Sequence, residues 1–182
     1  MSESRPLSVV VRPSGPAFLR EFFAAARKTL EQVPEVTTAE TNDGLLVEGL
    51  WEPDIERALD ALKTANPKGI SCSKQNIHFI EKDRVLEPIL LLAITVPEDY
   101  LGHVMGDINR RRGVVMGAED TRDGGRVLKV KAPLSQLIGY GAALKSLSNA
   151  QATVSAELAG YEEVPRFSPD DPNGPKAQAM RA

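Results

Sequence analysis

The amino-acid sequence predicts an α+β protein built from two successive β-α-β-β-α-β units, and three of its features lead to this prediction. Strand-like and helix-like segments follow one another in the same order twice, over residues 6–82 and again from residue 87. In each unit an Asp-Gly pair marks the turn between the two central strands. Apolar residues recur at helical spacing between the strands. This order is the split βαβ, or ferredoxin-like, arrangement: two consecutive sandwiches, each with two helices on one face of an antiparallel sheet.

The first unit starts with a β-rich segment that ends at the proline-containing break "PSGP". An amphipathic helix follows, because six apolar residues recur at helical spacing: Phe18, Leu19, Phe22, Phe23, Ala26 and Leu30. The turn "TNDG" predicts a hairpin with a type I′ turn. The second helix has Pro53 in its first turn, where proline is tolerated. We expect strands at residues 6–12, 34–40, 45–51 and 70–82, and helices at 17–33 and 52–65.

The second unit repeats these elements after the joining segment "KDRVLEP". Its first strand contains the apolar run "PILLLAITV", which is far shorter than the roughly 20 residues of a membrane helix and is interpreted as a buried strand. The segment "RVLKVKAP" alternates polar and apolar residues, as a half-buried strand does. We expect strands at residues 87–96, 113–120, 126–133 and 150–164, and helices at 97–112 and 134–148.

These units predict two domains and a tail. The first domain is expected at residues 1–83 and the second at 84–165. Residues 166–182 contain three prolines and few apolar groups, so they are expected to form a flexible tail.

The composition is that of a globular protein without a strong charge bias. The chain has 22 basic and 25 acidic residues and a net charge of −3, so any contact with nucleic acid must be a local patch. The single cysteine, Cys72, excludes an intramolecular disulfide and fits a cytoplasmic protein. We interpret Cys72 as an inert strand residue. The N-terminus has no secretory signal pattern, and no membrane association is expected.

Catalytic motifs are missing from the sequence. There is no Walker A motif for nucleotide phosphates, no dinucleotide-binding glycine motif and no nucleophile elbow. His78 and His103 are the only histidines, too few for a histidine-based metal centre. His78 alternates with Ile77 and Phe79 and is interpreted as a residue on the solvent face of a strand. We therefore expect no catalytic residues, no cofactor, no metal and no small-molecule substrate.

The segment "GDINRRRGVVMGAED" concentrates positive charge where a helix ends and a strand begins. Its arginines, Arg110–Arg112, either contact an anionic partner or simply interact favourably with the helix dipole. In the helix before them, four residues form the predicted core face: Leu101, Val104, Met105 and Ile108. His103, Asp99 and Arg110 lie on the opposite side, and Arg112 is expected nearer the core, with its stem over apolar neighbours.

Two glycines, Gly102 and Gly106, lie with Asn109 along one flank of that helix. Each costs roughly 1 kcal/mol of helix propensity relative to alanine. Either an external chain such as a sugar-phosphate backbone approaches closely here, or another element of the same protein does. For a second pair, Gly139 and Gly141, tight packing of a helix on the sheet is the favoured interpretation.

The second unit resembles the fifth, C-terminal domain of translation elongation factor G. The resemblance rests on several spaced motifs: "LEPI" (Leu86–Ile89), "PEDYLG" (Pro97–Gly102) and "GDINRRRG" (Gly106–Gly113). Further along the chain it rests on "PL" (Pro133–Leu134), "GY" (Gly139–Tyr140) and "YEEVP" (Tyr161–Pro165). The first unit is similar, much more weakly, to the third domain of these factors. It has "GLWEPDI" in place of that domain's "GELHL" stretch.

No segment resembles the family's GTP-binding, second or fourth domain. In the family the helix at the replaced stretch lies near the GTPase domain, so its loss implies that the chain does not serve a nucleotide switch in the same way. The resemblance implies a non-enzymatic protein that binds the large ribosomal subunit, at rRNA and proteins near the GTPase-associated centre, and that modulates or assists translation. A separate translational GTPase is a further expected partner. The residues expected to face RNA are Gly102, His103, Gly106, Asn109, Arg110, Arg111 and Arg112.

A protein-interaction module is the alternative hypothesis. The chain would then associate with a separate GTPase chain or with itself, without direct RNA contact. Trp51, the sole tryptophan, lies at a helix start and is the candidate protein contact. The competing interpretation is that Trp51 packs between the two domains.

Overall fold

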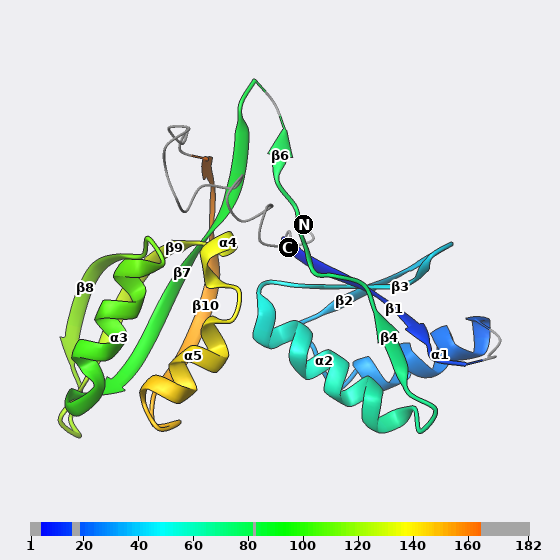
Figure 1. Cartoon of the computed structure of the whole chain (residues 1–182), viewed down its shortest axis with the longest axis horizontal. Helices are drawn as coiled ribbons and strands as arrows, with labels where there is room; N and C mark the ends of the chain where they lie inside the picture. Colours follow the sequence, from blue (N-terminus) through cyan, green and yellow to red (C-terminus); the bar gives the residue numbers. More distant parts are fainter. Residues whose placement is uncertain (1–4, 16–18, 82, 165–182) are drawn as a thin grey trace.

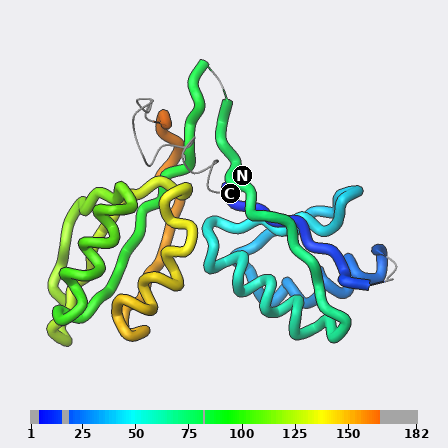
Figure 2. Tube along the Cα trace, in the orientation of Figure 1, coloured from blue at the N-terminus to red at the C-terminus, as the bar shows by residue number. Residues whose placement is uncertain are grey.

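Two antiparallel sheets, one in each half of the chain, organise the structure (Figure 1). It is a computed structural model and describes residues 5–15, 19–81 and 83–164. Figure 2 shows that the two halves lie side by side and are joined by a long hairpin above the sheets. The predicted tail lies outside the described residues. The division into domains at residues 83 and 84 stays a prediction.

The N-terminal half contains five strands and two helices: β1 (Leu7–Pro13), α1 (Leu19–Leu30), β2 (Thr37–Thr41), β3 (Gly44–Gly49), α2 (Glu52–Ala65), β4 (Ile70–Cys72) and β5 (Asn76–Ile77). The strand order is β2-β3-β1-β4, and β5 also pairs with β1. Both helices cover the same face of this sheet (Figure 1). Alternate residues of β1, Leu7, Val9 and Val11, point to that face and are at most 2% exposed.

The C-terminal half has the same plan: β6 (Ile80–Glu81), β7 (Val85–Pro97), α3 (Glu98–Arg110), β8 (Val114–Asp120), β9 (Gly125–Pro133), α4 (Leu134–Leu137), α5 (Tyr140–Leu147) and β10 (Thr153–Glu163). The strand order is β10-β7-β9-β8, with β6 paired to the start of β7. Leu90, Leu92, Ile94 and Val96 alternate along β7 and are fully buried. The predicted α+β architecture of two ferredoxin-like units is confirmed.

The last strand of the first unit differs from the prediction. The sequence predicts one strand at residues 70–82, but the described part of this segment, residues 70–81, contains three short strands. The first two, β4 and β5, pair with β1, whereas β6 pairs with β7 in the other sheet. The segment therefore leaves one sheet and enters the other, which the continuous β-like composition does not reveal.

The final helix also differs, because residues 134–148 form two helices instead of one. Gly139 has a φ of +75°, a left-handed conformation that ends α4 and starts α5. A Cβ at Gly139 would meet nothing within 4 Å, so this glycine is required for its backbone conformation and not for close packing.

The predicted hairpin between β2 and β3 is present, but the prediction of a type I′ turn is wrong. Thr41 pairs with Gly44 across the two-residue loop. A type I′ turn needs positive φ at both loop residues, and neither Asn42 nor Asp43 has one. Instead Gly44 has a φ of +139°, and a Cβ there would lie 2.6 Å from the carbonyl oxygen of Val11.

Within the described ranges, no helix is both long enough and apolar enough to cross a membrane. No cluster of three or more His, Cys, Asp or Glu side chains in these same ranges is arranged to hold a metal ion.

The burial pattern of β7 predicts the effect of substitutions on stability. Leu92 is fully buried under the helices, whereas its neighbour Leu91 is only half-buried on the opposite face. We expect Leu92→Ala to lower the free energy of unfolding by about 2–5 kcal/mol and Leu91→Ala by clearly less. Urea unfolding of the two variants measures the difference. Equal losses would contradict the assignment of the core to the helix-covered face.

A candidate nucleic-acid-binding surface on helix α3

The C-terminus of α3 is closed by a Schellman motif, a pair of hydrogen bonds that caps a helix. The amide of Gly113 donates to the carbonyl of Ile108 at 2.9 Å, and the amide of Arg112 donates to that of Asn109 at 3.1 Å. The left-handed position of this motif usually holds glycine, but here it is Arg112, with a φ of +59°. The glycine is one residue later because a Cβ at Gly113 would lie 2.6 Å from a methyl carbon of Ile108.

The two faces of α3 are as predicted. Val104 and Ile108 are at most 2% exposed, and Leu101 and Met105 pack against the core. His103, Asn109 and Arg110 are exposed on the outer side. We call the surface formed by Gly102, His103, Gly106, Asn109 and Arg110 the outer flank of α3.

The two glycines of the outer flank have no internal partner. A Cβ at Gly102 or Gly106 would meet nothing within 4 Å, and neither residue has a positive φ. Close approach by another element of the chain, one of the two interpretations of these glycines, is therefore not found in the described structure. The flank instead leaves α3 backbone accessible from outside.

The second glycine pair has different roles from those predicted. Gly139 is set by its backbone conformation, as described above. A Cβ at Gly141 would lie 3.0 Å from Cγ of Pro53, which belongs to α2 of the other half. The expected packing of this helix onto its own sheet does not account for either glycine.

Of the three arginines, only Arg110 extends freely from the helix. Its side chain is 75% exposed, and its nearest carboxylate oxygen, on Asp107, is 3.9 Å away. Nε of Arg110 donates to the carbonyl of Gly106 at 3.3 Å, within the same helix. The guanidinium therefore points along the outer flank and remains available to an anion.

Arg111 points inward and holds the helix to its neighbours. Its Nε donates to Asp107 at 2.7 Å, and its Nη1 donates to the carbonyls of Gln136 and Ile138 at 2.9 and 3.1 Å. Its guanidinium also lies 5.3 Å from the ring centre of Tyr140, a cation–π contact. The side chain is 21% exposed, so Arg111 is mainly a structural residue and offers little charge to a partner.

The environment of Tyr140 is consistent with this role. Burial raises the pKa of the Tyr140 hydroxyl well above its usual value, the charge of Asp107 raises it further, and Arg111 opposes both. The phenol therefore stays neutral, and its ring supplies a π face to Arg111.

Arg112 is half-buried and lies near a buried carboxylate. Glu87 is 6% exposed and accepts a hydrogen bond from the hydroxyl of Ser135 at 2.8 Å. Burial raises the pKa of Glu87, while this hydrogen bond and the positive charge of Arg112 lower it. The three arginines of the sequence cluster therefore have different environments: Arg110 is exposed to solvent, Arg111 packs inside the domain, and Arg112 is half-buried with its charge felt by Glu87.

Sequence reasoning missed Asp107, which holds Arg111 in place. The signal was present, because Asp107 and Arg111 are four residues apart and opposite charges at this spacing meet on a helix. The carbonyl partners of Arg111 had no such signal, since they depend on the break between α4 and α5.

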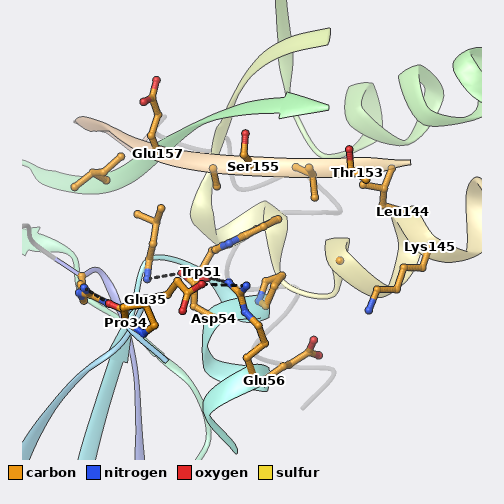
Figure 3. A pocket seen from close by; sticks show the side chains of 18 of the residues that line it. Pro34, Glu35, Trp51, Asp54, Glu56, Leu144, Lys145, Thr153, Ser155 and Glu157 are labelled. Atoms are coloured by element: carbon orange, nitrogen blue, oxygen red, sulfur yellow. Dashed lines mark hydrogen bonds and ion pairs between the residues drawn. The ribbon is translucent and has the colours of Figure 1, made fainter. Parts of the chain in front are cut away.

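Trp51 is buried, at 5% exposure, and therefore is not an exposed anchor. It lies beside a cleft of about 1090 Å³ between the two halves, lined by α2 on one side and by α5 and β10 on the other (Figure 3). Glu52, which lies between the lining residues Trp51 and Pro53 in the sequence, accepts a hydrogen bond through its carboxylate from the amide of Gly139. The interpretation that Trp51 packs between the two domains stays a prediction, and its position beside the cleft supports it.

The remaining candidate side chains lie apart from α3. The His78 ring is half-buried, with Nε2 2.8 Å from the hydroxyl of Ser8. Cys72 is exposed at the end of β4, not inside an apolar strand. Partial burial raises the pKa of its thiol, and the charge of Lys63 only partly offsets this effect.

Comparison with known proteins identifies the C-terminal half. A family model described as elongation factor G C-terminus matches residues 84–171. A crystal structure of a protein from Thermus thermophilus has a similar fold, with a TM-score of 0.62 and 16% sequence identity. The similarity covers 90% of this chain and 41% of that chain, so the present chain spans less than half of its neighbour's length.

The C-terminal half is thus a ferredoxin-like domain whose first helix presents an open, cationic flank. More specifically, residues 84–171 match a domain of the elongation factor G C-terminal type. Domains of this type are non-catalytic.

The contrast between Arg110 and Arg111 gives a testable prediction. Arg111→Ala removes hydrogen bonds to two carbonyls and leaves Asp107 without its closest cation, so we expect the free energy of unfolding to fall by about 1–3 kcal/mol. Arg110→Ala should change it by less than about 0.5 kcal/mol, because the side chain is exposed. Thermal or urea unfolding measures both variants. Equal effects would refute the structural role of Arg111.

Proposed function

We propose that this protein is non-enzymatic, binds the large ribosomal subunit near the GTPase-associated centre, and modulates or assists translation. The observation that carries the proposal is the outer flank of α3, where Gly102 and Gly106 leave helix backbone open beside the exposed Arg110. The match to the elongation factor G C-terminus supports the choice of the ribosome as the partner.

The chemistry of the outer flank suits an RNA backbone. A sugar-phosphate chain can approach open helix backbone, while Arg110 contacts a phosphate and Asn109 and His103 supply polar groups. With so few cations, the affinity should be modest and salt-sensitive, because each phosphate contact adds roughly −0.7 to −0.9 to the slope of log K against log salt. A net charge of −3 limits binding to this local patch.

The N-terminal half has a different part in the proposal. Its weak similarity to the third domain of elongation factor G suggests a module that once lay beside a GTPase domain. Because the sequence has no Walker A motif, any nucleotide hydrolysis would come from a separate translational GTPase. The raised pKa of Cys72 keeps its thiol protonated, which argues against a role as a nucleophile. We propose a cytoplasmic location, where ribosomes are.

The alternative proposal is a module that binds protein without contacting RNA. Its candidate contact residue, Trp51, does not support it. Trp51 is 5% exposed and cannot be the anchor of a partner surface in this conformation.

Ribosome pelleting with matched variants tests the proposal. We expect the double variant Gly102→Ala/Gly106→Ala to bind ribosomes more weakly, since two methyl groups would block the open backbone. The same variant should unfold at higher temperature, because each alanine favours the helix by about 1 kcal/mol. Arg110→Ala should also weaken binding, and all binding should decrease as salt is raised.

The controls are an arginine and a glycine of the same domain outside the outer flank. Arg122→Ala changes an exposed arginine in the β8–β9 loop, and Gly117→Ala fills open space on β8. Both should pellet with ribosomes as the unmodified protein does. The proposal is wrong if the protein does not pellet at low salt, or if the α3 variants bind as well as the controls.

A further inference from the structure

Strand β8 forms an open edge of the C-terminal sheet. The strand order places it last, paired only with β9, and Figures 1 and 2 show it on the side away from the N-terminal half. Unpaired backbone groups on such an edge can pair with another strand. The seven residues of β8 include no lysine or proline, and the charged residues that can protect an edge are confined to its last two positions, Glu119 and Asp120.

Two large apolar side chains are exposed on this edge. Val114 is 58% exposed and Met116 is 64% exposed, the two highest values among the large apolar residues of the described structure. Val114 pairs with Lys131 and therefore lies on the face away from the helices, whereas Val115 pairs with the buried Val130. The exposed pair is thus adjacent, on the open side of one edge strand.

The charges around β8 have opposite signs at its two ends. Arg110, the last residue of α3, lies shortly before the N-terminal end of β8. Glu119 and Asp120 are the last two residues of β8. Arg110 is 75% exposed and Asp120 is 85% exposed. The internal partners of the acidic pair, Lys129 and Arg126, are on β9 and leave both carboxylates in contact with solvent.

We propose that two copies of this chain associate through β8 in antiparallel orientation, centred on Val115. In this register Val115 lies opposite its own copy, and Val114 lies opposite Met116 of the second chain. The four exposed apolar side chains then meet on one face. The acidic end of each β8 faces the α3 C-terminus of the other copy, so Arg110 meets Asp120. Each end of the strand is thus complementary in charge to the other, which favours a second copy as the occupant.

The β-bulge in β8 limits the strength of this association. The register between β8 and β9 shifts between Val115 and Gly117, so Met116 has no direct partner on β9. Bulges restrict edge pairing, and the paired segment is therefore short. We expect a weak dimer that forms at high protein concentration, with an interface below the usual ~1,200–2,000 Å² of stable complexes.

Two other sheet edges, β2 and β10, do not offer the same combination. The edge strand β2 has the sequence "TTAET", without a large apolar residue. The edge strand β10 exposes Thr153, Ser155 and Glu157 and faces the cleft between the two halves (Figure 3). The large apolar residues that are exposed outside β8 are Leu19, Phe79, Val85 and Ile138. None of them lies on a strand at either end of the strand orders β2-β3-β1-β4 and β10-β7-β9-β8.

Sedimentation velocity over a protein concentration series tests the proposal. We expect the unmodified protein to shift from monomer toward dimer as its concentration rises from about 10 µM to about 1 mM, the range of a weak complex. Met116→Lys should remove this shift by placing two like charges at the edge. Val85→Lys, the same kind of change at an exposed strand residue away from β8, should leave it intact. A monomer at every concentration, or an unchanged shift in Met116→Lys, would overturn the proposal.

Disulfide cross-linking tests the register itself. In a Cys72→Ser background, Val114→Cys and Met116→Cys should form a cross-linked dimer when the two variants are mixed. Directly opposite Cα atoms in an antiparallel pair are about 4.5–5.5 Å apart, within the range that a disulfide spans. Either variant alone should cross-link much less, because its two cysteines are offset along the strand. Equal cross-linking in all three samples would contradict the register.

A charge exchange separates this proposal from ribosome binding, which also uses Arg110. Arg110→Asp and Asp120→Arg should each weaken the dimer, and the double variant should restore it. Ribosome pelleting should stay weak in the double variant, because Arg110 is still absent from α3. No restoration of the dimer would count against the pairing of Arg110 with Asp120, whatever the ribosome result.

Discussion

The inward orientation of Arg111 is the interaction on which the candidate surface depends. Its guanidinium joins Asp107 of α3 to the carbonyls of Gln136 and Ile138 and to the ring of Tyr140. Hydrogen bonds to a charged group in a half-buried site are stronger than those between neutral groups. They fix the end of α3 on the C-terminal domain. With this end fixed, the preceding arginine points outward and the following residue takes the left-handed cap position. One internal contact therefore sets the direction of the whole basic cluster.

The hydrogen bond from Arg111 to Ile138 lies next to a contact between the two halves of the chain. Ile138, whose carbonyl accepts from Arg111, comes directly before Gly139, whose amide donates to Glu52 at the start of α2. The break between α4 and α5 therefore contacts two other helices. The carbonyl of Ile138 accepts a hydrogen bond from α3, and the amide of Gly139 donates one to α2 of the N-terminal half. Since Pro53 also lies close to Gly141 in this region, a change in the position of α2 would act directly on the turn that holds Arg111. The outer flank of α3 and the domain boundary are linked by a few consecutive residues.

The sequence predicted the order of elements and the faces of the helices because these depend on local periodicity. The buried positions of α3, Val104 and Ile108, follow from apolar spacing alone. The split of residues 70–82 into three strands depends on which sheet each piece joins, and no local pattern encodes this choice. The direction of the Arg111 side chain depends on carbonyls 25 and 27 residues away. Three consecutive arginines in the sequence therefore do not indicate that their side chains have different environments. The sequence singles out Gly102 and Gly106, but whether another part of the chain fills the space beside them depends on tertiary packing, and in the described structure none does.

The most direct test of the account asks which surface faces rRNA when the protein is bound to the ribosome. An iron chelate attached at Asp99→Cys, in a Cys72→Ser background, would generate hydroxyl radicals next to the outer flank of α3. The same chelate at Lys68→Cys, on the N-terminal half, is the matched exposed control. The account predicts cleavage of large-subunit rRNA from the position on α3, near the GTPase-associated centre, and little or none there from the control. Cleavage of that region from residue 68 but not from residue 99 would show that another surface faces the RNA and would contradict the account.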